Sequence, residues 1–326
     1  MHTRFQISAV IPAHNAAKFL RRCIDSVLAQ TFRPIQIIIV DDGSTDDTRV
    51  VVKEYGNKLL YIKQDNSGCA SARNTGIYAS CADWIAFLDA DDEWHSHHLE
   101  NAMKILSRFE HLKWYGAPVD TYINQTSKLI RQYKEHKHSP LVNNGYFDDY
   151  MASVPPYAHF STCTMVIHKS VFAVVGMFNP EMKSGSDIDL WFRIALKYPE
   201  IGYSHCVAAN IYKRNNSISY SKSFDYDKSL SFLREREQLA ASLGDLVRKR
   251  AEPRIMYWVT NLLRSCISRS NEQAVKKLLS IYKSRLAFPW YMTAHAFLIA
   301  PYVFKLVFTL RNRFSSKRRA FRIAGF

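Results

Sequence analysis

The chain has 326 residues, a length that suffices for one large domain with an appendage. Hydrophobic residues make up 47% and charged residues 22% of it, and this composition excludes a largely disordered protein. The net charge of +15 is unevenly spread, because residues 201–326 contain 23 Lys and Arg against 7 Asp and Glu, whereas residues 1–200 are nearly balanced. This asymmetry predicts an anionic membrane surface or nucleic acid as a partner of the last part, or else a well-solvated basic surface.

The cysteine content argues against a disulfide framework and against zinc binding. Six cysteines are scattered along the chain and none forms a CxxC pair. The apolar stretch that Pro12 closes is too short for the core of a signal peptide. We therefore expect a reducing, cytoplasmic compartment.

The first 110 residues alternate between short apolar runs and amphipathic segments. The expected strands are Ile7–Ile11, Ile35–Val40, Leu59–Ile62 and Trp84–Leu88, and the expected helices are Ala16–Gln30, Asp46–Tyr55, Gly68–Ala79 and His97–Phe109. Ile35–Val40 is almost continuously apolar, as is typical of a parallel strand that is buried on both faces. This rhythm predicts an α/β fold with a doubly wound sheet.

The rest of the chain divides into three parts. Residues 125–160 are polar, and the Gly and Pro signals in them predict an irregular loop, which could contact a substrate. A strand over Thr164–His168 and a helix over about 187–197 complete the first domain. Only helices are expected beyond about residue 220. The predicted domains are residues 1–220 and a helical, basic extension over residues 221–326.

Carboxylates follow the fourth expected strand at Asp89, Asp91 and Asp92. Asp89 and Asp91 are two apart on an extended segment, so both side chains point the same way. Two adjacent carboxylates repel each other unless a cation lies between them, and Mg²⁺ or Mn²⁺ suits such oxygen ligands and a departing diphosphate. The alternative is a solvated acidic turn that caps the following helix.

A second acidic cluster, Asp41 and Asp42, ends the second strand. Residues 44–46 can cap the next helix, but that does not explain two carboxylates at the end of a buried strand. An Asp at this place can accept hydrogen bonds from a nucleobase N–H or a ribose hydroxyl. Open α/β sheets bind ligands beyond the carboxyl ends of their strands, which favours a ligand site here.

Small residues open the helix that follows the third strand, over residues 68–76. They allow a ligand or another backbone segment to approach closely, and Arg73 is a cation near the same edge. The alternative for Arg73 is a surface arginine that pairs with Asp65 or Asp42. This loop is neither a GxGxxG loop nor a Walker A loop.

Six segments in this order resemble the family 2 glycosyltransferases, which are inverting enzymes with the GT-A fold. They are Val10–Asn15, Val40–Asp46, Ala72–Gly76, Phe87–Asp92, Gly176–Phe178 and Ser186–Arg193. The resemblance covers about residues 5–215. It implies a doubly wound mixed sheet and a nucleotide-sugar donor.

The resemblance also implies roles for individual residues. The donor site would include Pro12, Asn15, Asp41, Asp42, Arg73 and Asp89. Asp89 and Asp91 would hold a Mn²⁺ or Mg²⁺ ion. Asp187 would be the catalytic base, and Trp191 would form a wall of the acceptor site. Two positions depart from the family pattern. Ser186 replaces the Glu that usually precedes the base, and Lys213 or Arg214 lies where a histidine is frequent, so either could contact the diphosphate.

Two alternatives concern the predicted catalytic base. Asp187 could instead be the N-cap of a helix over Ile188–Lys197. Asp189 could then be the functional carboxylate, or it could be a first-turn aspartate that the helix dipole favours.

The C-terminal part combines an apolar, aromatic segment over Phe288–Leu310 with a basic tail, and no acidic residue follows Glu272. This pattern predicts an interfacial or re-entrant segment on anionic lipid headgroups. The alternatives are a helix packed on the transferase domain and a single membrane span. Nucleic acid is not expected, because the aromatic residues precede the basic ones instead of alternating with them.

The resemblance implies a hexosyl- or N-acetylhexosaminyltransferase that uses a UDP-linked donor. Its acceptor would be a glycan or a lipid-linked molecule of surface polysaccharide or lipopolysaccharide biosynthesis. It would lie at the inner face of the cell membrane as a peripheral protein. The alternatives are a catalytically degenerate binding protein of the same fold, docked on membrane or nucleic acid, and a nucleotidyltransferase, whose glycine-rich loop is missing.

Overall fold

The structure is a computed structural model that describes residues 5–123, 129–131, 142–143, 145–152, 160–182, 184–213 and 225–299. The chain forms two compact units, residues 1–221 and 222–326, whereas the sequence pattern places the boundary at residue 220. Each unit is described by itself below.

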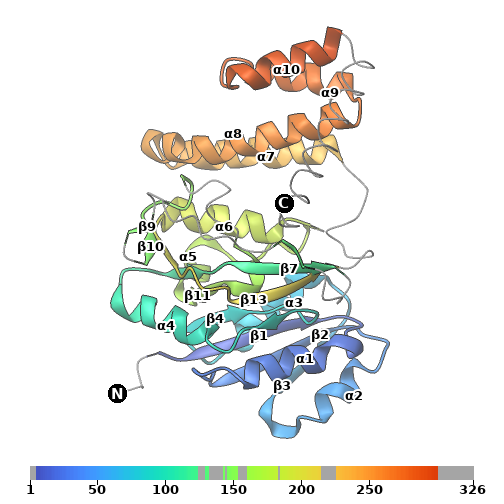
Figure 1. The fold of residues 1–326 in the computed structure, drawn as a ribbon, viewed down its shortest axis with the longest axis vertical. Helices are drawn as coiled ribbons and strands as arrows, with labels where there is room; N and C mark the ends of the chain where they lie inside the picture. The colour runs from blue at the N-terminus through green and yellow to red at the C-terminus, as the bar shows by residue number, and fades with distance from the viewer. Residues whose placement is uncertain are drawn as a thin grey trace, which may run out of the picture. The chain divides into compact units, whose positions relative to one another are not determined.

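The N-terminal unit is built on a mixed sheet with the strand order β3-β2-β1-β4-β11-β6-β12-β10-β9 (Figure 1). Its strands are β1 (Ile7–Ala13), β2 (Gln36–Asp42), β3 (Leu60–Gln64), β4 (Trp84–Phe87), β6 (Trp114–Gly116), β9 (Val142–Asn143), β10 (Tyr146–Phe147), β11 (Val166–His168) and β12 (Ile201–Tyr203). The helices are α1 (Ala17–Leu28), α2 (Thr48–Lys53), α3 (Cys69–Ala79), α4 (His98–Arg108), α5 (Ser170–Val175) and α6 (Ser186–Lys197). The alternating order of strands and helices predicted for the first 110 residues is present.

The centre of this sheet is buried because its strands are apolar on both faces. All seven residues of β1 and all four of β4 are buried. Helix α1 is amphipathic and buries Leu20, Cys23, Ile24 and Val27. On α3, Gly76 allows a close approach to the sheet, since an added Cβ atom there would lie 2.3 Å from a methyl group of Val10.

Strand direction determines which residues share the functional edge. β1 is parallel to β2 and β4, and β2 is parallel to β3, so the carboxyl ends of these strands meet at one edge. β11 is antiparallel to β4, and its register pairs Val166 with Ala86 and His168 with Trp84. The residues before β11 therefore lie at the edge where β4 ends.

Several short strands were not predicted from the sequence. A second sheet has the order β5-β13-β7-β8 and consists of β5 (Glu93–Trp94), β13 (Ala209–Lys213), β7 (Val119–Ile123) and β8 (Leu129–Arg131). β8, β9 and β10 fall within residues 125–160, so the expectation of a wholly irregular loop there is wrong. Strands of two or three residues are too short to show an alternating pattern.

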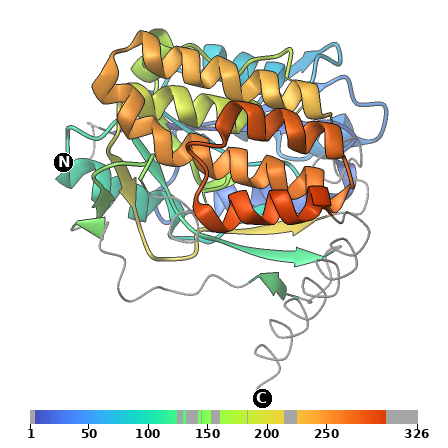
Figure 2. The same ribbon diagram turned by 90° about the horizontal axis from the view of Figure 1, so that it is seen from above.

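The C-terminal unit is helical throughout residues 225–299. It consists of α7 (Tyr226–Ser242), α8 (Asp245–Ser268), α9 (Glu272–Tyr282) and α10 (Phe288–Ile299), which Figure 2 shows in yellow-orange to red. Neighbouring helices pack together, α7 on α8, α8 on α9, and α10 on both α8 and α9. No helix within the described residues has the length and apolar character that a membrane span requires.

Candidate active site

A buried arginine joins the helix α3 to the acidic segment after β4. The Arg73 guanidinium lies 2.6 Å from an Asp89 carboxylate oxygen, and its side chain is 9% exposed against 32% for Asp89. Pairing of Arg73 with Asp65 or Asp42, the alternative expected from the sequence, is therefore wrong. Burial lowers the pKa of Arg73, but Cys69, Asp89 and Asp187 together raise that pKa by more than burial lowers it. The guanidinium therefore stays charged.

Asp187 belongs to the same cluster of charges, because its carboxylate acts on Arg73 together with Asp89. The Thr162 hydroxyl donates a hydrogen bond to one Asp187 oxygen at 3.1 Å, and the Ile188 N–H donates to the other at 2.9 Å. The helix begins after Gly185, whose φ of 78° is left-handed, so Asp187 lies in the first turn and is not the N-cap. The N-cap alternative is wrong.

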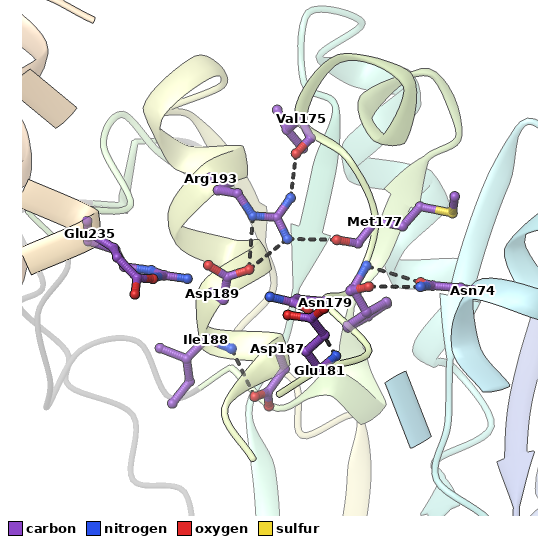
Figure 3. A network of polar contacts seen from close by, with 12 residues as sticks. Asn74, Val175, Met177, Asn179, Glu181, Asp187, Ile188, Asp189, Arg193 and Glu235 are labelled. Atoms are coloured by element: carbon purple, nitrogen blue, oxygen red, sulfur yellow. Dashed lines mark hydrogen bonds and ion pairs between the residues drawn. The ribbon is translucent and has the colours of Figure 1, made fainter. Parts of the chain in front are cut away.

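A network of polar contacts holds α6 and the segment that precedes it in place (Figure 3). Arg193 pairs with Asp189 at 2.8 Å and donates to the carbonyl oxygens of Val175 and Met177. Asn74 of α3 donates to the Phe178 carbonyl at 2.8 Å and accepts from the Phe178 N–H at 3.1 Å. The side chain of Asp189 is only 3% exposed, which disfavours it as the functional carboxylate.

The two carboxylates that end β2 accept hydrogen bonds from other residues of the chain. Asp42 accepts hydrogen bonds from the Gln64 side chain and from the N–H groups of Ser67 and Gly68, each at 2.8 Å. Asp41 accepts from the Ser44 N–H at 2.8 Å and from the Tyr61 hydroxyl at 2.5 Å. Both residues are buried. These contacts hold the two loops beside β2, and the predicted binding of the donor by Asp41 and Asp42 stays a prediction.

The end of β1 supports the same loops. Asn15 adopts a left-handed φ of 49°, and its side-chain oxygen accepts hydrogen bonds from the N–H groups of Thr45 at 2.9 Å and Asp46 at 3.3 Å. Its own N–H donates to the Ser44 hydroxyl at 2.9 Å. Pro12 is buried within β1. The roles of Pro12 and Asn15 beside a nucleotide stay predictions.

The segment after β4 places a cysteine among the carboxylates. The Cys163 thiol donates to Asp92 at 2.9 Å and lies 3.5 Å from Asp89. Asp92 is buried, and its pKa is raised well above the usual range by burial and then by the charges of Asp91 and Asp89. No sequence signal indicated Thr162 or Cys163, because only the antiparallel direction of β11 brings them to this edge.

These carboxylates fit a hard divalent cation. Asp89, Asp92 and Cys163 each offer a ligand atom, and these atoms lie within 4.8 Å of one another. Carboxylate oxygens suit Mg²⁺ or Mn²⁺, whereas burial raises the pKa of the Cys163 thiol, so the sulfur serves as a hydrogen-bond donor. Asp91 is outside this group, although its carbonyl oxygen accepts a hydrogen bond from Arg22 at 2.6 Å. Its role as a metal ligand stays a prediction.

Among the remaining predicted site residues, the structure places Lys213 and Trp191 but does not describe Arg214. Arg214 lies outside the described residues, and Lys213 is the exposed last residue of β13. Trp191 is 3% exposed and packs against Phe178 and Trp114, with ring centroids 5.9 Å and 6.5 Å away. The structure thus shows Trp191 in the core, and its place in the acceptor site stays a prediction.

Comparison with known proteins identifies the family. The family model described as Glycosyl transferase family 2 matches residues 8–175, which is more than half of the chain. The chain belongs to glycosyl transferase family 2. The predicted family is therefore confirmed, and the matched region contains all the carboxylates of the cluster except Asp187.

Similar proteins extend this result. An uncharacterized glycosyltransferase of Rickettsia prowazekii is 32% identical over 190 residues, which are 57% of this chain and 58% of the relative. An uncharacterized glycosyltransferase of Rickettsia typhi is 31% identical over 202 residues, which are 61% of each chain. The chain thus spans about three-fifths of the length of these relatives.

Solved structures show the fold. The crystal structure of S. aureus TarS 1–349 in complex with UDP-GlcNAc is similar with a TM-score of 0.67 and 16% identity, and the match covers 94% of this chain and 92% of that one. The structure of the same TarS fragment with UDP matches with a TM-score of 0.64. At this level of identity the likeness concerns the fold alone, and it confirms the predicted GT-A fold with a helical C-terminal region.

Proposed function

We propose that this chain is an inverting glycosyltransferase that moves a sugar from a nucleotide diphosphate onto an acceptor hydroxyl. One observation carries the proposal, namely that the adjacent residues Thr162 and Cys163 contact the carboxylates of Asp187 and Asp89, which are 98 positions apart in sequence, while Arg73 pairs with Asp89 at 2.6 Å. A base and a metal-binding carboxylate beside one fixed cation are the groups that this reaction requires.

The reaction assigns a task to each group. Asp187 accepts the proton of the acceptor hydroxyl while that oxygen attacks the anomeric carbon and the bond to the diphosphate breaks on the opposite face. Attack from that face inverts the configuration. Arg73 orients the Asp89 carboxylate through a contact of 2.6 Å. A divalent ion bound by Asp89 and Asp91 would supply charge neutralisation for the departing diphosphate.

We propose a UDP-linked hexose or N-acetylhexosamine as the donor. The sequence resemblance suggests this class, and the TarS fragment of the same fold forms a complex with UDP-GlcNAc. The acceptor in this proposal is a glycan or lipid-linked molecule of surface polysaccharide or lipopolysaccharide biosynthesis. A degenerate binding protein is the less favoured alternative, because the carboxylate cluster and its arginine are intact.

Hydrolysis of nucleotide sugars tests the activity. We expect turnover of UDP-hexoses or UDP-N-acetylhexosamines by the wild type with Mn²⁺ but not with EDTA, and loss of turnover in Asp91→Ala. Asp83→Ala is a matched control, because Asp83 is exposed and immediately precedes the other end of β4. Equal turnover with Mn²⁺ and with EDTA would contradict the metal requirement, and full turnover by Asp91→Ala would contradict the role of Asp91.

We also propose that the C-terminal region holds the protein at the inner, cytoplasmic face of the membrane. The positive charge of residues 201–326 supports this location, and so does α10, where Phe288, Met292 and Ile299 are 73%, 47% and 83% exposed. These three side chains share one face of the helix, because they follow a spacing of four and then seven residues.

Sedimentation with anionic vesicles tests the location. We expect the wild type to sediment and the double variant Phe288→Ser, Met292→Ser to sediment several-fold less. Leu246→Ser is the control, because Leu246 is 80% exposed but belongs to α8. Equal sedimentation of all three proteins would count against α10 as the contact. No sedimentation of the wild type would remove the membrane proposal without affecting the activity.

A further inference from the structure

The helical unit contains a cavity of about 420 Å³ to which none of the active-site residues contributes. One face of α8 lines it with Met256, Tyr257, Thr260, Asn261 and Arg264, and Trp290 of α10 forms part of the wall. These α8 positions follow the helical repeat, so their side chains point to the same side. The volume falls within the range of about 300–1,000 Å³ that is usual for small-molecule sites.

The polar groups of this wall are available to a ligand. The Tyr257 hydroxyl, the Asn261 amide and the Arg264 guanidinium have no hydrogen-bond or ion-pair partner among the described residues. The Thr260 hydroxyl donates to the Met256 carbonyl at 2.8 Å, which leaves its oxygen able to accept a hydrogen bond. A hydroxyl, an amide and a guanidinium that converge on one cavity can bind a ligand rich in hydroxyl groups.

The two arginines of the cavity differ in their charge balance. Arg285 pairs with Glu252 at 2.6 Å and with Glu237 at 2.5 Å, and hydrogen bonding to these carboxylates raises its pKa. Arg264 stacks over the Trp290 ring at 4.9 Å and has no carboxylate partner within residues 225–299. Stacking fixes the plane of the guanidinium and leaves its N–H groups free, so Arg264 can pair with an anion.

We infer that this cavity binds an anionic saccharide, that is, a sugar bearing a carboxylate or a phosphate group. The anion would pair with Arg264, the hydroxyls would bind Tyr257, Thr260 and Asn261, and an apolar ring face would lie on the aromatic wall. A lipid phosphate would supply the anion but would leave these three polar groups unused, which favours the sugar. The saccharide class rests on the proposed glycan acceptor, but the site is separate from the active-site residues.

Binding to the full-length protein tests this inference, with glucose 6-phosphate, glucuronic acid, glucose and short-chain phosphatidic acid as probes in NMR titrations. We expect the two anionic sugars to bind at least tenfold more tightly than glucose, since a charge-assisted contact is worth about one order of magnitude or more. Arg264→Gln should abolish that preference, and Asn261→Ala should weaken all three sugars. Lys276→Gln is the matched control, because Lys276 is an exposed cation of α9 that does not line the cavity.

The inference is overturned if no sugar binds, if Arg264→Gln and Lys276→Gln weaken binding equally, or if phosphatidic acid binds as tightly as glucose 6-phosphate. Circular dichroism verifies that each variant is folded. Nucleotide-sugar hydrolysis separates the two proposals, because Arg264→Gln should keep the wild-type rate. Hydrolysis without sugar binding contradicts only the cavity site, whereas sugar binding without hydrolysis by the wild type contradicts only the proposed function.

Discussion

The ends of β2 and β4 carry carboxylates at the same edge of the sheet but surround them differently. At β2 the chain's own N–H and hydroxyl groups bind both oxygens of Asp41 and both of Asp42. At β4 three of four consecutive positions are acidic, and burial, followed by the charges of Asp91 and Asp89, raises the pKa of Asp92. At β2 hydrogen bonds from the chain make the carboxylates part of the scaffold, whereas at β4 Arg73 pairs with Asp89 and the repulsion among the other carboxylates favours a further cation.

The largest effect is expected from Asp187, the proposed catalytic base, which belongs to the β4 side of this comparison. Asp187→Asn should lower the rate of nucleotide-sugar hydrolysis by about 10²–10⁴, because the amide cannot accept the proton. Donor affinity from calorimetry should stay within about threefold, since the substitution keeps the shape of the side chain. Glu181→Gln, an exposed acid near α6, is the control. A rate unchanged in Asp187→Asn would transfer the role to another carboxylate.

Removal of the cation that pairs with Asp89 should destabilise the β4 side. Arg73→Gln leaves Asp89 beside Asp92 and Cys163 without its partner, and we expect the free energy of unfolding in urea to fall by about 2 kcal/mol, less than for a fully buried pair because Asp89 is 32% exposed. The control is Arg21→Gln, whose pair with Glu54 is 55% and 45% exposed, so solvent screens it and its loss should change the stability far less. Equal losses of unfolding free energy in the two variants would show that burial does not make the Arg73–Asp89 pair more stabilising than the Arg21–Glu54 pair.

Substitutions at the end of β2 should lower the stability of the fold more than they lower nucleotide binding. Asp42→Ala removes the acceptor of the Ser67 and Gly68 N–H groups, so stability should fall by about 1–3 kcal/mol. Asp42→Asn keeps one oxygen and should lose less. Urea unfolding measures the stability, and calorimetry with UDP on the folded variants measures nucleotide binding. Full stability combined with lost UDP binding in Asp42→Ala would reverse the scaffold assignment of β2.

Acid sensitivity gives a further test, because a buried base packs on Trp94 of β5 and Tyr115 of β6. His98 packs against Trp94, neither of its ring nitrogens has a hydrogen-bond partner, and burial lowers its pKa to about 3. The unfolded state, with a pKa of about 6.5, binds this proton first, so stability is lost as the pH falls from about 6.5 towards 3. Between pH 7 and pH 5 this residue should account for about 1–2 kcal/mol.

Urea unfolding at pH 7 and at pH 5 measures the contribution of His98 to the loss of stability. His98→Leu should lose less stability on acidification than the wild type, because the unfolded variant has no imidazole at this position to protonate. His97→Gln, at the exposed neighbouring position, should behave like the wild type. Identical acid losses in His98→Leu and the wild type would assign the effect to the carboxylates alone.

The sequence predicts the fold best where elements are long and periodic. Ile35–Val40 and Gly68–Ala79 correspond closely to β2 and α3, and the change of rhythm near residue 220 falls where the helices begin. Short strands such as β6 and β12 lack a period and were missed. Tertiary pairing brings Thr162 and Cys163 to Asp187 and Asp92, and no local pattern encodes it. The cavity of the helical unit was missed because it depends on which face of α8 the other helices leave uncovered.

The reversed direction of β11 has a consequence for how specificity can change. Because β11 runs against β4, the segment that precedes it, and not the one that follows, reaches the rim. Side-chain substitutions within residues 160–164 of that segment would change the groups beside the carboxylates while the pairing of β11 with β4 is retained. The fold thus separates a frame of paired strands from an edge segment whose side chains can be exchanged without disturbing that frame.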